Sequence, residues 1–388
     1  MQVLTSTGSE LHAAWAAPAT FALLPDRAPV DRAWVAERLR ALPDDLREHG
    51  FALLTSGSTG RPKLIVGRRG RAEALARSLH AVQDNEPCAE ALVALPLSYS
   101  FAFVNQWVWA HVTGRPLRRS PGLADPAGLR AALAGADAAM LCLVGVQGAL
   151  IAEQFAGEAF EGVARLHFAG GRFPQEHLPR LRAIFPAAAI SNNFGCAEAM
   201  PRLTHRRAEA AADAADVGHP LPGIELRTGA GGALEFRSPF RAVAVADDAG
   251  VRRIAEDDWV ATGDVGEPGS DGRWRVTGRT HEVFKRHGEK VHLAAVVGAL
   301  SQAWGGELGS YRERDRRGED GWVLVLAPQP QPQQVRPLLR LLRDRFARAH
   351  WPLRIEGLPT LPHLPNGKVD ARCLAGATAT TIAWDQRA

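Results

Sequence analysis

The stretch 54-LTSGSTGRPKL-64 places two glycines, four hydroxyl side chains, a proline and a lysine within eleven residues. It continues the apolar run 50-GFALLT-55, which predicts a buried strand that ends where the glycines begin. Glycine permits a sharp turn, and backbone N–H groups together with hydroxyls in such a turn can surround phosphate oxygens. The turn residues are Ser56, Gly57, Ser58, Thr59 and Gly60.

Lys63, fixed behind Pro62, adds a positive charge to this loop. The pattern is not the Walker A motif, because G-x-x-x-x-G-K-[ST] is absent and Leu64 follows the lysine. From these residues alone, two interpretations remain open: a polyphosphate-binding loop, and the Gly/Ser-rich turn of an ordinary hairpin.

Outward from this loop, short apolar runs typical of strands alternate with helical patterns. The predicted strands are 50–55, 91–97, 139–145, 164–170 and 187–195, and the predicted helices are 71–83, 126–136 and 175–185. Strand, helix, strand repetition at this spacing is typical of an α/β layer with a largely parallel sheet. We therefore predict the α/β class for the larger, N-terminal part of the chain.

The pattern changes in residues 217–278, whose short, turn-rich and alternating runs predict an antiparallel β-rich subdomain. Beyond Arg279 the sequence predicts a small α+β unit. Its expected elements are a helix over 292–303, a strand over 321–328 and a helix over 333–350. We accordingly expect a large domain over 1–279 and a small C-terminal domain over 280–388.

Composition places the 388-residue chain among ordinary globular proteins, with 46% hydrophobic and 23% charged residues. Lysine plus arginine exceeds aspartate plus glutamate by only 46 to 42, and the two signs are interspersed, so we expect no nucleic-acid partner. No apolar run reaches the roughly 18 residues of a membrane span. The four cysteines lack the spacing of a zinc site, which favours free thiols in a reducing cytoplasm.

The loop and seven later segments together resemble the adenylate-forming superfamily, which includes acyl- and aryl-CoA ligases, nonribosomal peptide adenylation domains and luciferases. The loop 55-TSGSTGRPK-63 is similar to the family's phosphate-binding signature. The later segments follow in the family's order: 96-PLSYSFA-102, 168-FAGGRFP-174, 193-NFGCAEA-199, 217-VGHPLPGIEL-226, 262-TGD-264, 278-GRTHEVFKRHGEKV-291 and 365-PNGKVD-370. The ordered series implies the family's fold, with a mobile C-terminal domain and a shortened N-terminal region.

By this resemblance the chain uses ATP and Mg²⁺ to activate a carboxylic acid. Lys368 resembles the family's mobile catalytic lysine, which bridges carboxylate and phosphate oxygens, and Lys63 is the expected lysine of the phosphate loop. Glu198 matches the acid that binds Mg²⁺, a suitable role for a hard carboxylate beside phosphate oxygens.

The same resemblance implies the nucleotide-binding set. Phe194 stands where the family has tyrosine and keeps an aromatic face for adenine, whereas Ala197 lacks the family's threonine hydroxyl. Asp264 is expected to bind the ribose hydroxyls, and Arg279 the ribose or a phosphate. The full set is Thr55, Ser56, Gly57, Ser58, Thr59, Gly60, Gly170, Gly171, Arg172, Asn193, Phe194, Gly195, Asp264 and Arg279.

The start of the C-terminal domain carries a departure from the family. The hinge residue is usually Asp or Lys, and this chain has His281, which could make domain rotation pH-sensitive. Lys285 and Gly288 fall where the second half-reaction guides a pantetheine thiol.

Family analogy places the acid pocket near 99–109, 168–171 and 192–195. The aromatic run 99-YSFAFVNQWVW-109 suggests a planar or unsaturated acid, although a helix packed into the core would carry the same residues. The expected pocket residues are Tyr99, Phe101, Phe103 and Asn192.

The resulting hypothesis is a ligase that forms an aryl- or acyl-AMP, releases pyrophosphate and transfers the acyl group to a thiol of coenzyme A or of a separate acyl carrier protein's phosphopantetheine. We expect it to act as a monomer or homodimer. Two alternatives remain: transfer to a nitrogen nucleophile, and a degenerate nucleotide-binding scaffold without catalysis.

Overall fold

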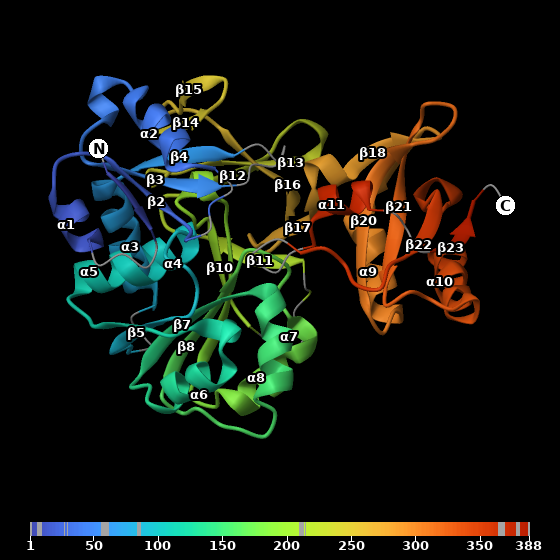
Figure 1. Ribbon diagram of the computed structural model, residues 1–388, viewed down its shortest axis with the longest axis horizontal. Helices are drawn as coiled ribbons and strands as arrows, with labels where there is room; N and C mark the ends of the chain where they lie inside the picture. Colours follow the sequence, from blue (N-terminus) through green and yellow to red (C-terminus); the bar gives the residue numbers. More distant parts are fainter. Residues whose placement is uncertain are drawn as a thin grey trace. The chain divides into compact units, whose positions relative to one another are not determined.

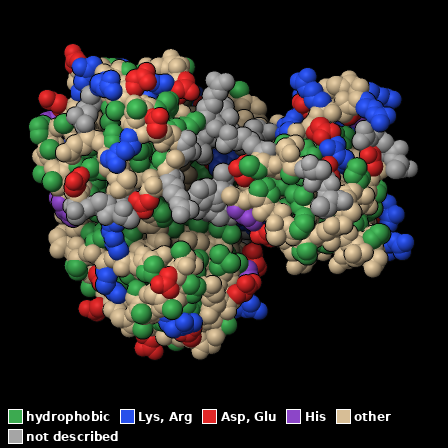
Figure 2. All heavy atoms as spheres, in the orientation of Figure 1, with side chains coloured by type: hydrophobic (Ala, Val, Ile, Leu, Met, Phe, Trp, Pro, Cys, Tyr) green, Lys and Arg blue, Asp and Glu red, His purple; other side chains and the backbone are tan. Residues whose placement is uncertain are grey.

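The computed structural model describes residues 2–5, 10–26, 28, 30–55, 62–83, 87–208, 213, 215–363, 369–377 and 381–386 (Figure 1). The chain divides into two compact units. The N-terminal unit holds Met1–Thr262 and Glu267–Arg275, and the C-terminal unit holds Gly263–Gly266 and Val276–Ala388. Acidic and basic side chains are interspersed over the described face of the N-terminal unit in Figure 2.

A six-stranded sheet in the N-terminal unit has the order β1-β2-β3-β4-β14-β15. Its strands are β1 (Val3–Thr5), β2 (Phe21–Leu24), β3 (Gly50–Thr55), β4 (Lys63–Arg68), β14 (Ala244–Asp247) and β15 (Gly250–Arg253). The first three are parallel, and β3 and β4 form an antiparallel hairpin. Helices α1 (Leu11–Ala16), α2 (Arg32–Arg40) and α3 (Arg69–Gln83) belong to the same part of the chain.

Arg69 ties the N-terminal segment to this sheet. Its guanidinium donates to the carbonyl oxygens of Gly50 (3.2 Å), Trp15 (2.7 Å), Ala19 (2.5 Å) and Ala17. Burial lowers the pKa of Arg69, which fits a cation whose N–H groups are satisfied by backbone oxygens and not by water. These bonds fix the strand that leads into the Ser/Thr-rich loop.

An eleven-stranded sheet has the order β12-β13-β16-β17-β11-β10-β9-β8-β7-β5-β6. Its strands are β5 (Glu90–Val93), β6 (Leu117–Arg119), β7 (Ala139–Val144), β8 (Val163–Ala169), β9 (Ala189–Phe194), β10 (Thr204–Arg207), β11 (Asp216–Pro220), β12 (Glu225–Thr228), β13 (Ala233–Arg237), β16 (Val260–Pro268) and β17 (Trp274–Arg279). The run β6-β5-β7-β8-β9 is parallel, and β10 turns the pairing antiparallel. The parallel layer is therefore the one the sequence predicts.

Helices connect the strands of this larger sheet. They are α4 (Ser100–Ala102), the π-helix η2 (Phe103–Val108), α5 (Trp109–Thr113), α6 (Pro126–Ala134), α7 (Gly145–Gln154) and α8 (Leu178–Ile184). The start of α6 follows local rules, since the Asp125 carboxylate accepts the Gly128 N–H (3.0 Å) and Pro126 occupies the first helical position. The segment 100–113 packs against α3, so the aromatic run is a core helix.

The C-terminal unit has its own hydrophobic core. A two-stranded ribbon, β18 (Val283–Arg286) and β19 (Glu289–His292), precedes a four-stranded sheet of order β20-β21-β22-β23. The remaining elements are β20 (Glu307–Arg314), β21 (Asp320–Ala327), β22 (Arg354–Gly357), β23 (Thr381–Asp385), α9 (Leu293–Ala303), α10 (Pro332–Arg345) and α11 (Ala371–Gly376). In α10 the buried residues Val335, Leu338 and Leu342 recur at helical spacing and face this core.

Two elements differ from the prediction. The helix expected over 333–350 ends at Arg345, because Phe346 adopts extended backbone angles and packs against the core before a 3-10 turn at Arg348–His350. The strands of 217–278 do not form a separate sheet, since they extend the two sheets built by the earlier strands. Among the described residues, every helix is too short or too polar to traverse a bilayer.

Candidate active site

The β3–β4 hairpin carries the loop that opens the sequence motif. Thr55, the last residue of β3, lies opposite Lys63, the first residue of β4, and its hydroxyl donates to the Lys63 carbonyl oxygen at 3.5 Å. Ser56, Gly57, Ser58, Thr59 and Gly60 lie outside the described residues. The two ends of the loop are thus held side by side by strand pairing.

Lys63 and Glu198 form an ion pair across a long sequence separation. The Lys63 Nζ is 2.6 Å from the Glu198 Oε1, and the side chains are 24% and 17% exposed. Glu198 sits in the short 3-10 turn Ala197–Ala199 after β9, and its carbonyl oxygen accepts the Ala242 N–H at 2.8 Å. Because the pair is mostly shielded from water, its electrostatic interaction is stronger than that of a surface pair.

The end of β9 holds three further predicted positions. Phe194 is partly exposed, and Asn193 is 2% exposed with its Nδ2 3.2 Å from the His167 Nδ1. A Cβ on Gly195 would lie 1.7 Å from the Pro201 carbonyl oxygen, so only glycine fits there. This close approach packs the turn that carries Glu198 against the following chain.

The turn after β8 contains Gly170, Gly171 and Arg172, all exposed. Gly170 has φ of +74°, a conformation that favours glycine. Arg172 lies 3.9 Å from Glu176, and both side chains are about half exposed or more, so this pair contributes little to stability. The turn therefore presents backbone and an arginine at the carboxyl end of a parallel strand, where ligands bind in open α/β sheets.

The four expected pocket residues fall into different environments. Tyr99 is partly exposed, and burial raises its pKa. Phe101 is 8% exposed, and Asn192 donates to the Asp216 carbonyl oxygen at 3.3 Å. Phe103 is fully buried and stacks on Trp107 with ring centroids 5.4 Å apart, so its ring contributes to the core.

Asp264 and Arg279 pair within the C-terminal unit. The Arg279 Nη1 is 3.0 Å from the Asp264 Oδ1, and the carboxylate side chain is only 8% exposed. Gly263 precedes the carboxylate with φ of +81°. The Thr280 hydroxyl donates to the Asp264 carbonyl oxygen at 3.4 Å, so the residue after Arg279 also contacts Asp264.

The expected thiolation residues lie on the β18–β19 ribbon. Lys285 is exposed and pairs with Lys290 across the ribbon, and Gly288 has φ of +80° in the connecting turn. His281 lies in the 3-10 turn Thr280–Glu282, but its side chain is outside the described part of the chain, as is the whole of Lys368.

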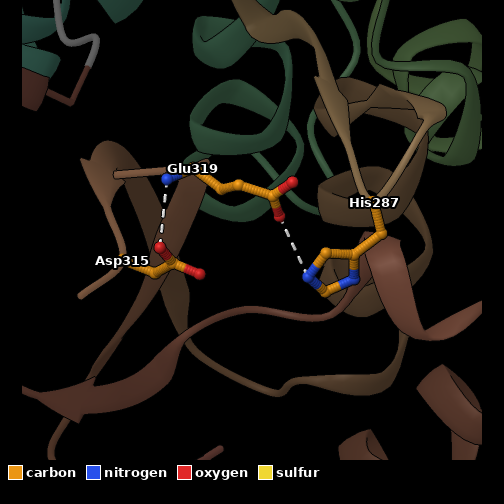
Figure 3. A group of neighbouring side chains, drawn as sticks. All are labelled: His287, Asp315 and Glu319. Carbon is orange, nitrogen blue, oxygen red and sulfur yellow. Dashed lines mark hydrogen bonds and ion pairs between the residues drawn. The ribbon is translucent and has the colours of Figure 1, made fainter. Parts of the chain in front are cut away.

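A second group of possible metal ligands lies elsewhere in the C-terminal unit (Figure 3). The His287 Nε2 is 3.1 Å from the Glu319 Oε2, and the Asp315 Oδ1 accepts the N–H groups of Arg317 (2.8 Å) and Glu319 (3.0 Å). Those N–H groups lower the pKa of Asp315. Turn bonds and an exposed ion pair account for this arrangement, and we assign no metal to it.

The sequence analysis missed a group of polar side chains that β8 and the segment after the Glu198 turn bring into the interior. Arg202 and His167 are buried and His205 is partly buried, and desolvation lowers the pKa of His205 to about 4. A signal was available, because the strand 164-ARLHFAG-170 carries Arg165 and His167 where a buried parallel strand is usually apolar.

The chain is similar in sequence to several known proteins. A curated relative from Rhodococcus jostii, a 3-[(3aS,4S,7aS)-7a-methyl-1,5-dioxo-octahydro-1H-inden-4-yl]propanoyl:CoA ligase, is 29% identical over 39% of this chain and 30% of its own length. The non-ribosomal peptide synthetase CmlP of Streptomyces venezuelae is 25% identical over 84% of this chain and 34% of its own length. These matches therefore span about a third of the relatives' length.

Among solved structures, the O-succinylbenzoate coenzyme A synthetase MenE from Bacillus subtilis, in complex with AMP, shares the fold. Its TM-score is 0.76 at 17% identity, and the match covers 98% of this chain and 89% of that one. The family model described as "AMP-binding enzyme" matches residues 14–228, more than half of the chain. The chain therefore belongs to the AMP-binding enzyme family of the adenylate-forming superfamily.

Proposed function

We propose that the chain activates a carboxylic acid with ATP and then transfers the acyl group to a thiol. In the first step a carboxylate oxygen forms a bond to the α-phosphorus, the bond from that phosphorus to the bridging oxygen breaks, and pyrophosphate leaves. The observation that carries the proposal is the Lys63–Glu198 pair, which holds a cation and a carboxylate 2.6 Å apart at the end of the Ser/Thr-rich loop.

Such a reaction needs positive charge and fixed donors around the phosphates. Lys63 begins β4, so its charge lies directly after the loop whose composition suits phosphate oxygens. The structure supports the role because the lysine backbone is fixed by hairpin pairing and its ammonium by Glu198.

The donors present also fit Mg²⁺. Glu198 offers a hard, partly exposed carboxylate, and its Oε2 has no hydrogen-bond partner among the described residues. Mg²⁺ commonly takes one or two protein carboxylates and fills its remaining positions with water and substrate phosphate oxygens. When bound, the ion would supply charge neutralisation to ATP, while Lys63 orients the carboxylate that holds it.

The C-terminal unit supplies the other proposed contacts. Asp264 is proposed to accept hydrogen bonds from two ribose hydroxyls, which the ion pair of its buried carboxylate with Arg279 and the bond from Thr280 to its backbone carbonyl oxygen support. We assign the role of catalytic lysine to Lys368, and the role of guiding the pantetheine thiol to Lys285 and Gly288. These assignments rest on the resemblance alone.

The acid is proposed to be aryl or unsaturated, and the acceptor a thiol of coenzyme A or of a carrier protein. The Rhodococcus relative is named as a CoA ligase, the Bacillus structure as a CoA synthetase for an aromatic acid, and CmlP as a peptide synthetase. These names support the reaction type, and they are compatible with either acceptor, coenzyme A or a carrier protein.

The test is ATP–pyrophosphate exchange with purified protein across aryl, fatty and amino acids. Carboxylate-dependent exchange is expected, followed by capture of the acyl group with coenzyme A, a phosphopantetheinylated carrier or an amine, which identifies the acceptor. Binding of ATP without exchange for any acid would instead support a nucleotide-binding scaffold.

Lys368→Ala and Lys285→Ala separate the two half-reactions. The Lys368 change should lower exchange by about 10²-fold or more, and leave thiolation of a supplied acyl-AMP. Lys285→Ala should do the reverse. Equal loss of both half-reactions in the Lys368 variant contradicts the role assigned to this lysine.

A further inference from the structure

Arg202 is a cation enclosed in the N-terminal unit, and none of the carboxylates in the described part of the chain forms an ion pair with it. Its side chain is 1% exposed, and its Nη1 donates to the Asn105 Oδ1 at 2.5 Å. The Nε and Nη2 atoms are buried and have no hydrogen-bond partner among the described residues. Leaving charged donors unpaired in a protein interior is costly, so a structural role alone does not explain this arginine.

The surroundings do not neutralise the charge. Burial lowers the pKa of Arg202 to about 9, and the described ionisable group that favours its charged form is the Cys142 thiol. Burial raises the pKa of that thiol, which keeps it neutral. An anion that enters from outside the protein would supply the missing charge.

A second unsatisfied donor belongs to the same region. His167 is 2% exposed, its Nδ1 faces the Asn193 Nδ2, and its Nε2 has no described partner. With Asn193 donating to Nδ1, the ring hydrogen lies on Nε2. His167 lies opposite Cys142 across the β7–β8 pairing, and the charge of Arg202 contributes to the lowered pKa of the ring.

These donors adjoin the segments proposed to bind the nucleotide and the acid. A Cβ on Gly195 would lie 3.1 Å from the Arg202 Cα, and the Leu203 N–H donates to the Phe194 carbonyl oxygen at 2.9 Å. Asn105, the partner of Arg202, lies in the π-helix of the aromatic segment, and π-helical turns are frequent at functional sites.

We propose that Arg202 selects the substrate, and that the acid is a dicarboxylate whose second carboxylate binds the Arg202 guanidinium beside the His167 Nε2–H. This inference rests on the proposed function, and it deepens that function by naming the substrate class. The planar guanidinium suits a carboxylate because it donates two parallel hydrogen bonds, and a methyl or ring terminus would leave the donors unpaired.

The experiment compares matched acids in ATP–pyrophosphate exchange: benzoate with isophthalate and terephthalate, 4-phenylbutyrate with 2-succinylbenzoate, and hexanoate with adipate. The wild-type protein should favour at least one diacid over its monoacid partner by about 10²-fold or more in kcat/KM. Arg202→Met should reduce that ratio at least tenfold, and Arg202→Lys should retain part of it.

Arg241→Met is the matched control. Arg241 is equally buried and its Nε also has no described partner, but its Nη1 and Nη2 donate to the backbone oxygens of Ser238 and Ala255. Its loss should lower stability without changing the diacid-to-monoacid ratio. A wild-type preference for monoacids, or a ratio unchanged in Arg202→Met, would overturn the proposal.

Calorimetric binding of the same acids in the presence of AMP keeps the two proposals distinguishable. If none of the acids supports ATP–pyrophosphate exchange, the ligase function is contradicted. The calorimetry still decides the role of Arg202. Tighter binding of a diacid, weakened at least tenfold in Arg202→Met or Arg202→Gln, supports the proposal, whereas equal binding of diacid and monoacid contradicts it.

Discussion

Lys63 and Glu198 stand 135 positions apart in the chain, and their charged atoms are 2.6 Å apart in the folded protein. A glutamine at position 198 keeps the shape and removes the charge that attracts both Lys63 and a metal ion. The pair therefore offers a direct way to separate metal binding from general nucleotide affinity.

We predict that Glu198→Gln lowers the rate of pyrophosphate exchange by about 10²-fold and shifts the Mg²⁺ dependence to higher concentration. Titration of Mg²⁺ at saturating ATP measures both effects. Glu176→Gln, which removes an exposed carboxylate that pairs loosely with Arg172, is the control. An unchanged Mg²⁺ dependence in the Glu198 variant would remove this residue from the metal site.

His205 should make the folded protein sensitive to mild acid. Burial, together with the charge of Arg202, lowers its pKa to about 4 from an ordinary value near 6.5, so the unfolded chain binds the proton first as pH falls. Stability from this group is therefore complete above about pH 6.5 and is lost down to about pH 4, at up to roughly 1.4 kcal/mol per pH unit.

Urea unfolding at pH 7.5 and 5.5 checks this expectation. His205→Gln should lose less free energy of unfolding between the two pH values than the wild-type protein does. His219→Gln, on the exposed end of β11, should behave like the wild type. Identical losses in the His205 variant and the wild type would show that other groups cause the acid sensitivity.

At this scale the ordered motifs single out residues whose roles stay predictions. Lys63 with Glu198, and Asp264 with Arg279, are adjacent as pairs in the structure. The buried arginine at position 202 could not be predicted in the same way, because its separation from the described carboxylates depends on the strands that pack around it. Likewise, periodicity could not decide whether the ring of Phe103 faces a pocket or the core.

Among the elements, the junction between β9 and the Glu198 turn depends on one glycine. Gly195→Ala would place a methyl group 1.7 Å from the Pro201 carbonyl oxygen, which must move. We predict a loss of several kcal/mol in the free energy of unfolding, together with a higher KM for ATP, because the displaced turn carries Glu198.

Denaturant unfolding and exchange kinetics measure these two effects. Gly70→Ala is the control, because a Cβ there meets nothing within 4 Å and position 70 lies within α3, where alanine should stabilise by roughly 0.5–1 kcal/mol. Equal stability of the two variants would show that the β9 turn accommodates a side chain.

The positions of strands and helices could be predicted from the sequence wherever one local pattern, such as an apolar run or helical spacing, was present. The parallel strands β5, β7, β8 and β9 appear within or close to their predicted ranges, and β5 stops before Pro96. Which sheet a strand joins is a different matter, because β14 pairs with β4 through contacts nearly 180 residues apart. No local signal carries that information.

At the scale of the molecule, each unit buries its own apolar side chains. Leu338 belongs to the C-terminal core and Leu141 to a core of the N-terminal unit, and both are fully buried. Leucine-to-alanine changes at such positions typically cost about 2–5 kcal/mol. We predict that each substitution lowers the melting temperature of its own unit.

Differential scanning calorimetry of the full chain tests this. Leu338→Ala should move one component of the unfolding endotherm downward and Leu141→Ala another. A single transition that shifts equally in both variants would mean that the units unfold together.

Residues 263–266 belong to the C-terminal unit, although they lie in the middle of β16 and the two ends of that strand belong to the N-terminal unit. A chimera that exchanges residues 280–388 with those of a homologue would keep Asp264 and Arg279 with one parent but take Thr280, whose hydroxyl donates to the Asp264 carbonyl oxygen, from the other. Crossovers placed ahead of Gly263 would take Asp264, Arg279 and Thr280 from the same parent, so grafting experiments should succeed more often there.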